Sequence, residues 1–151
     1  MTTHRAMLEV LRVRVAFADT DAMGVAWHGN YLRWFEMART ELMRHTDLPY
    51  PALIERGLHL PLIEATVRYR RPARNDDELV VLVSPSRTGG VRLRMDNRIE
   101  CAGALVAEGH TEHAFTDAAG RVRRPPRDVL EVFARLAARH THPGGHHEPS
   151  R

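Results

Sequence analysis

Residues 30–45 carry the apolar pattern of one long helix, and this segment constrains the fold more than any other. Such a pattern occupies one face of a helix of about four turns. Asn30 is a favourable residue type for the N-cap, and the proline-containing stretch TDLPYP ends the segment. A face this rich in aromatic rings must be covered by other elements of the chain. Its members fall at positions i, i+3, i+4, i+7 and i+11, namely Tyr31, Trp34, Phe35, Ala38 and Leu42.

Five other segments have the patterns of β-strands, one before this helix and four after it. Residues 8–17 alternate between apolar side chains, among them Val15 and Phe17, and the arginines Arg12 and Arg14. Residues 78–86 are apolar at consecutive positions, as in a strand that is covered on both faces. The four later strands are predicted at residues 63–73, 78–86, 91–100 and 104–117.

The C-terminal part contains a second helical pattern and a tail without one. Residues 127–139 place apolar side chains at helical spacing behind two prolines, and Asp128 is positioned to cap this helix. Residues 140–151 are rich in histidine and lack apolar periodicity, so we expect a disordered tail. A chain of 151 residues fits one domain, which we place at residues 1–139.

This order of elements predicts an α+β fold with a five-stranded antiparallel sheet. The sheet must cover its apolar face, and the helix at residues 30–45 is the one long aromatic-rich helix available. We therefore expect the sheet to wrap around that central helix, with the C-terminal helix as the last element of the domain.

Composition excludes several classes of protein. Apolar residues make up 43% of the chain and charged residues 27%, which is typical of a water-soluble globular protein. No segment approaches the ~20 apolar residues of a membrane-spanning helix, and arginines interrupt the apolar positions near the N-terminus. Cys101 is the single cysteine, which suits a reducing compartment. The sequence predicts a cytoplasmic protein without membrane insertion.

The balance of charge is close to even and points to no nucleic-acid partner. There are 22 basic and 19 acidic residues, so the formal net charge is +3. Neither an aromatic RNA-binding pattern nor paired Cys/His spacing accompanies this small excess. Gly-rich nucleotide loops and the GxSxG nucleophile motif are also absent from the sequence. The histidines between residues 140 and 147 lie in a Pro/Gly-rich setting, so we expect no metal site there.

The stretch DTDAMGVAWHGNYLRWFEMAR, residues 19–39, carries the most specific signal in the chain. It resembles the D-x-D-x-x-G-x-V/A-x-H-x-x-Y-x-x-x-x-E-x-A-R signature of hotdog-fold acyl-CoA thioesterases, in particular the 4-hydroxybenzoyl-CoA thioesterase and YbgC-like group. The later stretch VRYRRPARNDDELVV is similar to the strand-turn-strand motif of the same family. The resemblance covers roughly residues 8–136.

Membership of this family implies a fold, an assembly and a reaction. The fold is the hotdog, and its members form dimers and often tetramers with active sites at the subunit interface. The reaction hydrolyses an acyl-CoA thioester to a free acid and CoA, without a metal or redox cofactor. Asp21 matches the catalytic carboxylate of the family, and backbone amides at the start of the first helix polarise the thioester carbonyl.

Physical chemistry independently supports these roles. Fixed donors that meet the negative charge on the carbonyl oxygen lower the barrier to attack. The N–H groups of a helix that begins near Asn30, together with the turn at Gly24 and Val25, are suitable donors. Asp21 is ionised at neutral pH and can attack directly to form an acyl anhydride. The alternative, activation of water, requires a raised pKa, and we favour direct attack slightly.

Two further residues of the motif are candidates for the site. His28 follows Asp21 by seven residues and lies near the helix entrance, where it can orient the carboxylate or the thioester. A lone histidine is more often a structural residue, and only the motif favours a catalytic role. Tyr31 is placed near the substrate by the motif, although an aromatic residue on an apolar face is usually part of the core.

The remaining acids of the motif have simpler interpretations. Asp19 is expected to hydrogen-bond the backbone of its own turn. Glu36 precedes Arg39 by three residues, so an ion pair within the helix is expected. A different branch of the hotdog fold uses a helical glutamate as its catalytic acid, which makes Glu36 the reserve candidate.

Arginines near strand ends are candidates for contact with the CoA phosphates, because the guanidinium fork matches phosphate oxygens. We assign this role to Arg70, Arg71 and Arg87, with Arg74 nearby in sequence.

The acyl group stays open, because a single methylene changes specificity by only ~1 to 3 kcal/mol. Two alternative functions are a non-hydrolytic acyl-thioester binding protein and a thioesterase for acyl carrier protein or polyketide intermediates. A hydratase of the same fold is disfavoured, since its Asp-x4-His pair does not match the spacing of Asp21 and His28.

Overall fold

The sheet in this computed structural model has five antiparallel strands in the order β1-β3-β4-β5-β2. The structure describes residues 7–87 and 90–138, without the side chain of Arg87. Strands β1 and β2 form the two edges of the sheet, and β3, β4 and β5 are joined by hairpin connections. The elements are β1 (Leu8–Arg14), η1 (Phe17–Asp19), α1 (Asn30–Arg44), α2 (Tyr50–Glu55), β2 (Leu62–Tyr69), β3 (Glu78–Arg87), β4 (Arg92–Cys101), β5 (Ala104–Ala114) and α3 (Arg127–Ala138).

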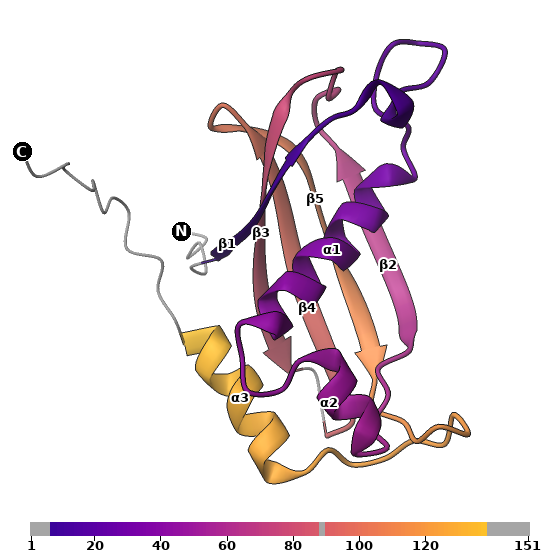
Figure 1. The fold of residues 1–151 in the computed structure, drawn as a ribbon, viewed down its shortest axis with the longest axis vertical. Helices are drawn as coiled ribbons and strands as arrows, with labels where there is room; N and C mark the ends of the chain where they lie inside the picture. Colours follow the sequence, from indigo (N-terminus) through magenta and orange to yellow (C-terminus); the bar gives the residue numbers. More distant parts are fainter. Residues whose placement is uncertain (1–6, 88–89, 139–151) are drawn as a thin grey trace, which may run out of the picture.

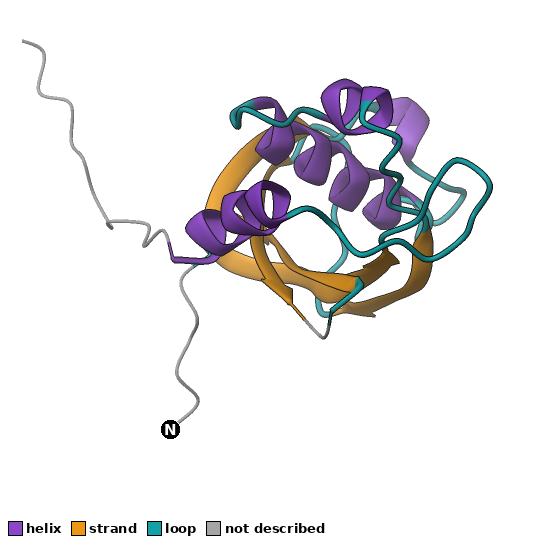
Figure 2. Cartoon of the chain, turned by 90° about the horizontal axis from the view of Figure 1, so that it is seen from below, coloured by secondary structure: helices purple, strands orange, loops and turns teal. Residues whose placement is uncertain are grey.

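The sheet curves around α1, which confirms the predicted α+β hotdog arrangement. Figure 1 shows α1 crossing the sheet, and Figure 2 shows the strands curving beneath the helices. All five predicted strands and both predicted long helices are present. Helix α3 lies at the end of the sheet where β3 finishes and β4 begins, and its buried apolar residues join the same core as those of α1. The predicted tail, residues 140–151, lies outside the described residues.

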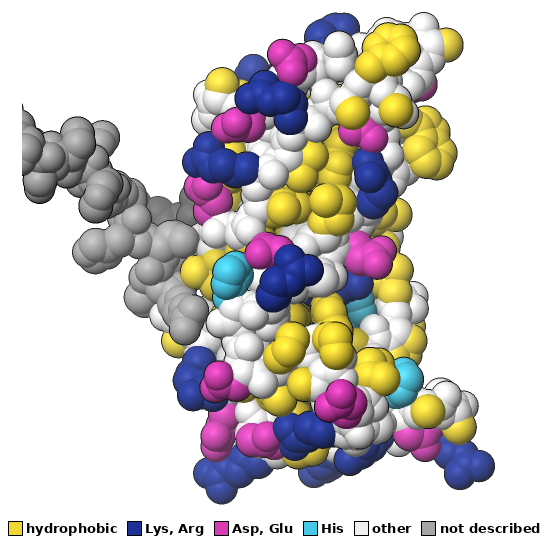
Figure 3. Space-filling model, viewed as in Figure 1, with side chains coloured by type: hydrophobic (Ala, Val, Ile, Leu, Met, Phe, Trp, Pro, Cys, Tyr) yellow, Lys and Arg dark blue, Asp and Glu magenta, His cyan; other side chains and the backbone are white. Residues whose placement is uncertain are grey.

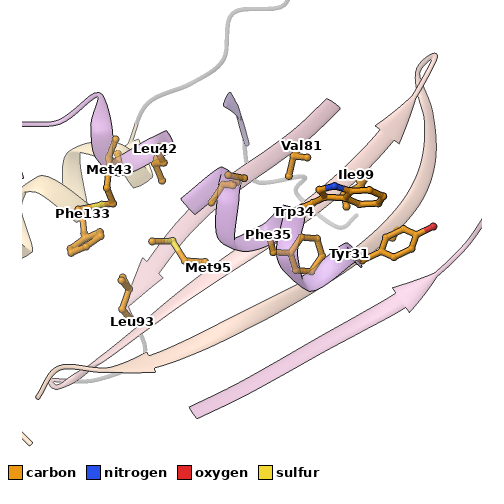
Figure 4. Packing of buried hydrophobic residues seen from close by; sticks show 14 of the residues in the cluster. Tyr31, Trp34, Phe35, Leu42, Met43, Val81, Leu93, Met95, Ile99 and Phe133 are labelled. Carbon is orange, nitrogen blue, oxygen red and sulfur yellow. The ribbon is translucent and has the colours of Figure 1, made fainter. Parts of the chain in front are cut away.

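The predicted apolar face of α1 is buried against the sheet. Trp34 and Phe35 are each 1% exposed, and they face Val81, Met95 and Ile99 of the central strands (Figure 4). Burial of each large side chain contributes roughly 1.5–3 kcal/mol relative to exposure. This packing fixes the axis of α1, and therefore the position of its N-terminus, relative to the sheet.

The chain between β1 and α1 differs from the prediction in two ways. The first strand ends at Arg14, and Phe17 lies in the 3-10 turn η1 with 80% of its surface exposed. Asp19 causes this change, because its Oδ2 accepts a hydrogen bond from the N–H of Ala16 and closes the turn. Asn30 is the first helical residue rather than the N-cap, since its Nδ2 donates to the carbonyl of Asp19 at 2.7 Å.

Two further differences lie around the other helices. The short helix α2 was not predicted, because six residues are too few for a clear period. Asp128 is inside the first turn of α3 rather than at its N-cap. Its carboxylate instead forms a two-point ion pair with Arg56, at 2.7 and 2.9 Å, which joins α3 to the end of α2. No helix in the described part of the chain is long and apolar enough to span a bilayer.

Candidate active site

The loop that leads into α1 is held in a fixed shape by its own backbone. The N–H of Asp21 donates to the carbonyl of Val25, and the N–H of Gly24 donates to the carbonyl of Asp21, both at 2.9 Å. Gly24 has φ +75°, a conformation that favours glycine. The N–H of Ala26 then donates to the carbonyl of Ala73 at 2.7 Å, which ties the loop to the segment after β2.

The Asp21 side chain is half-buried and only partly engaged. Its Oδ1 accepts a hydrogen bond from the N–H of Met23 at 2.9 Å, which orients the carboxylate within its own turn. The structure gives Oδ2 no donor among the described residues. One carboxylate oxygen is therefore held by the backbone while the other is available to a substrate.

Asp21 lies in a cleft of about 310 Å³ between the loop, the start of α1 and the end of β2. Six of the eight predicted site residues line this cleft, and Gly24 lies in the loop beside it without lining it. Segments that are distant in sequence thus meet at one place. The lining residues are Asp21, Met23, Val25, Ala26, His28, Tyr31, Tyr69, Arg70, Arg71 and Pro72.

The start of α1 presents backbone donors at this cleft. Gly29 is the N-cap of α1, and His28 precedes it. Within the described residues, the backbone N–H groups of His28 and Val25 have no protein acceptor. The positive end of the helix dipole adds to their attraction for negative charge. The imidazole of His28 is exposed, and its ring lies 4.9 Å from that of Trp27.

Two tyrosines, Tyr31 and Tyr69, line the cleft together with the loop. Tyr31 is 2% exposed, and burial raises the pKa of its hydroxyl, partly offset by a hydrogen bond with the backbone of Ala73. The ring of Tyr69 meets that of Tyr31 edge-on, with centroids 4.9 Å apart. The Tyr69 hydroxyl donates to the carbonyl of His28 at 2.7 Å.

Tyr69 is a residue of the cleft that the sequence did not predict as part of the site. The one signal in the sequence was its position, since an aromatic residue at the end of an alternating strand can contact a neighbouring element. Burial explains why the pKa of its hydroxyl is also raised. The contact with His28 was not predictable, since it joins residues that are 41 positions apart.

The predicted arginines differ in their surroundings. Arg70 is ion-paired with Glu108, with 2.7 Å between Nη2 and Oε1. Arg71 lines the cleft, and no carboxylate in the described part of the chain pairs with it. Arg87 ends β3 at the opposite end from Glu78, so its backbone does not lie at this cleft. The prediction that Arg87 contacts the same substrate therefore has no support within one protomer.

The other acids of the motif are separated from the cleft. Both oxygens of Asp19 are engaged, one by the N–H of Ala16 and one by Arg33 at 2.7 Å, as expected for a structural residue. Glu36 lines a different hollow on the outer side of α1. The predicted Glu36–Arg39 ion pair is absent, because Arg39 instead donates to Nε2 of His113 at 3.0 Å. Among the described residues, no group of acids, histidines or cysteines is arranged to hold a metal.

Comparison with known proteins decides the family. The model of the thioesterase-like superfamily matches residues 15–133. The chain belongs to this superfamily. A putative esterase of Aquifex aeolicus is 32% identical over 124 residues, which cover 82% of this chain and 96% of that protein. The acyl-CoA thioesterase YbgC of Haemophilus influenzae is 35% identical over 127 residues, covering 82% and 93% of the two chains.

A solved structure agrees with these matches. The crystal structure of a hypothetical protein from Thermus thermophilus has a TM-score of 0.80 at 32% identity and covers 85% of this chain and 99% of that one. The predicted family and enzyme class are confirmed: the chain is a thioester hydrolase of the hotdog fold. The superfamily match contains every residue that lines the cleft.

Proposed function

We propose that the protein hydrolyses acyl-CoA thioesters in the cleft beside Asp21. The observation that carries this proposal is the meeting of a half-buried carboxylate with backbone donors at the start of α1. The family match, and the name of the Haemophilus relative, support CoA as the thiol. The reaction as proposed uses residues of the chain and water, without a metal or redox cofactor.

In the proposed mechanism the thioester carbonyl lies between Asp21 and the first amides of α1. The N–H groups of His28 and Val25 receive the developing negative charge on the carbonyl oxygen. The free oxygen of Asp21 attacks the carbonyl carbon, the carbon–sulfur bond breaks, and the CoA thiolate leaves and takes up a proton. Water then hydrolyses the acyl–Asp21 anhydride, which releases the free acid and restores the carboxylate.

The second possible role of Asp21 is that of a general base for water. Single turnover in oxygen-18 water tests the anhydride route, because label enters the Asp21 carboxylate only when water attacks an anhydride at the Asp21 carbon. Attack of labelled water on the acyl carbonyl leaves Asp21 unlabelled on either route. Label in the Asp21 carboxylate supports the anhydride with water attack at the Asp21 carbon. We prefer the anhydride, because the carboxylate can act without a raised pKa.

The other cleft residues are proposed to bind and orient the substrate. His28 lies at the rim, where its imidazole can hydrogen-bond the carboxylate or the thioester. Tyr31 and Tyr69 supply an aromatic wall for the acyl part. Arg71, which has no ion-pair partner among the described residues, is a better candidate for a CoA phosphate than Arg70, which is held by Glu108.

The test compares Asp21→Asn with Glu36→Gln, a matched change of a carboxylate outside the cleft. Free-thiol release is measured over a panel of acyl-CoA thioesters. We expect kcat of Asp21→Asn to fall by orders of magnitude, because the chemical step loses its nucleophile or base. Glu36→Gln is expected to retain activity. Equal turnover of Asp21→Asn and the wild type contradicts the proposed role of Asp21. Loss of turnover in Glu36→Gln alone would instead make Glu36 the catalytic carboxylate.

A further inference from the structure

We propose that Tyr69 is a positioning residue of the reaction, whose hydroxyl fixes the backbone at the entrance of α1. This inference rests on the proposed function, since it concerns the amides that receive charge from the thioester carbonyl. Tyr69 would act through the His28–Gly29 peptide and not on the reacting atoms themselves.

The first support is the hydrogen bond itself. The Tyr69 hydroxyl donates to the carbonyl of His28 over 2.7 Å, a short distance for such a bond. The His28 carbonyl lies just before the N-cap of α1, where regular helical hydrogen bonds have not yet begun. A bond from outside the helix therefore sets the orientation of the His28–Gly29 peptide. It also restricts rotation about the backbone of His28, whose own N–H, on the other side of the same Cα, is one of the two proposed donors.

The second support is that the same peptide is held from another side. The ring of Trp27 lies so close to Gly29 that an added Cβ would approach its Cζ3 atom to 2.3 Å. Glycine at this position lets the indole lie directly over the backbone. The peptide between His28 and Gly29 thus lies beside the Trp27 ring and accepts the hydrogen bond from Tyr69.

The third support is the rigidity of Tyr69. It is the last residue of β2, and the next two N–H groups, of Arg70 and Arg71, both donate to the carbonyl of Val106, at 2.8 and 3.0 Å. Its ring also packs edge-on against the buried ring of Tyr31. A group on a fixed strand end positions a catalytic element more precisely than one on a free loop.

The test compares Tyr69→Phe with Thr46→Val. Phenylalanine keeps the ring and removes the hydroxyl. Thr46 makes the same kind of bond, from its hydroxyl to the carbonyl of Met43 at 2.7 Å, but at the opposite end of α1. We expect the single-turnover rate of thiol release to fall about tenfold in Tyr69→Phe with KM changed less than about twofold. Thr46→Val is expected to keep both parameters.

A spectroscopic readout separates positioning from a structural effect. The carbonyl stretching band of a thioester bound to the Asp21→Asn variant reports how strongly the amides polarise that carbonyl. Adding Tyr69→Phe is expected to return the band toward its frequency in water, and adding Thr46→Val is expected to leave it in place. The melting temperature of each variant is measured alongside.

The outcomes distinguish this inference from the proposed function. If the wild type turns over and Tyr69→Phe changes neither the rate of thiol release nor the carbonyl band, the role of Tyr69 is overturned. The proposed function then remains intact. A fall in rate that is matched by Thr46→Val, or that occurs without a shift of the band, also overturns it. Absence of wild-type turnover on every thioester removes the proposed function and this inference together.

Discussion

At the scale of single residues, Asp19 and Asp21 show how two neighbouring acids acquire different roles. Both oxygens of Asp19 accept hydrogen bonds, from Ala16 and Arg33, and its carbonyl accepts two more, from Trp27 and Asn30. Asp21 uses one oxygen for its own turn and keeps the other in the cleft. A carboxylate whose oxygens are all engaged stabilises the loop, whereas one with a free oxygen can react.

Arg71 provides a prediction about recognition of CoA. The variant Arg71→Gln is expected to raise KM for an acyl-CoA by about three- to tenfold, because one charge-assisted contact to a phosphate is lost. For the matching N-acetylcysteamine thioester, which lacks phosphates, KM is expected to stay unchanged. Arg12→Gln is the control, since Arg12 is exposed on β1 and paired with Glu9 and Glu78. An equal rise of KM for both substrates would show that Arg71 stabilises the fold or contacts the acyl group and does not bind a phosphate.

His113 occupies a different position, deep in the protein next to a positive charge. Its side chain is 0% exposed, and its Nε2 faces Arg39 and Thr111, both at 3.0 Å. Arg39 can only donate, so Nε2 is the acceptor and Nδ1–H donates to the carbonyl of Leu60. Burial, followed by the charge of Arg39, lowers the pKa of His113 to about 4.

This shift predicts a loss of stability in acid. The pKa of an unfolded histidine is near 6.5, so between about pH 6.5 and 4 the unfolded chain binds the proton more readily than the folded one. The free energy of unfolding should therefore fall over this range, by about 3 kcal/mol from this residue. Urea unfolding at several pH values should show a flatter profile for His113→Gln than for the wild type. His45→Gln, at an exposed site, should keep the wild-type profile, and a parallel profile for His113→Gln would disprove the assignment.

At the scale of elements, the period of the sequence was enough to predict the strands, the long helices and their order. The helical spacing at Trp34 and Phe35 and the alternation along β4 each follow from local residues and from one buried face. The order of these elements, with one aromatic-rich helix and five strands, also led to a sheet wrapped around one helix, and the resemblance to the thioesterase family implied the hotdog fold. Local patterns are informative here because the buried face of a helix recurs once per turn, and that of a strand recurs at every second residue.

The side-chain contacts that were predicted wrongly have a common cause. In each case the actual partner comes from a distant part of the chain. Asn30 bonds the carbonyl of Asp19 and Arg39 bonds His113, and both contacts replace the local ones expected. Most of the candidate site was predictable, because a family motif places its residues in one loop and helix. Tyr69 was missed for the same reason as the helix caps, since its partner His28 belongs to another element.

The packing of β2 against β5 gives a prediction about an element. Gly109 of β5 lies so close to β2 that an added Cβ would be 1.9 Å from the carbonyl oxygen of Thr66. Gly109→Ala must therefore push β2 away, and we expect it to lower the free energy of unfolding by roughly 2 to 3 kcal/mol. Gly90→Ala is the control and should be nearly neutral, because an added Cβ there would meet no atom of the described residues within 4 Å. Similar urea midpoints for the two variants would contradict this close packing.

At the scale of the whole molecule, strand β2 leaves one side of the sheet open. It pairs with β5 along one side, and the described residues provide no strand along the other. Leu62 and Ile63 of this strand are 55% and 48% exposed, and apolar atoms follow the same flank of the molecule in Figure 3. An edge strand with exposed apolar side chains pairs readily with another chain. We propose that a second copy occupies it, which would give the dimer expected for the family.

The dimer can be tested with one substitution on this edge. Light scattering after size exclusion should give the wild type about twice the chain mass of 17.2 kDa. Ile63→Arg places a charge that would be buried between two copies, so it should produce a monomer. Its turnover should also fall, because Tyr69 lies on the same strand and contacts the entrance of α1. Val122→Arg, at a 66% exposed position outside the sheet, should remain dimeric and active. A monomeric wild type, or a dimeric Ile63→Arg variant, would show that β2 is not the contact between copies.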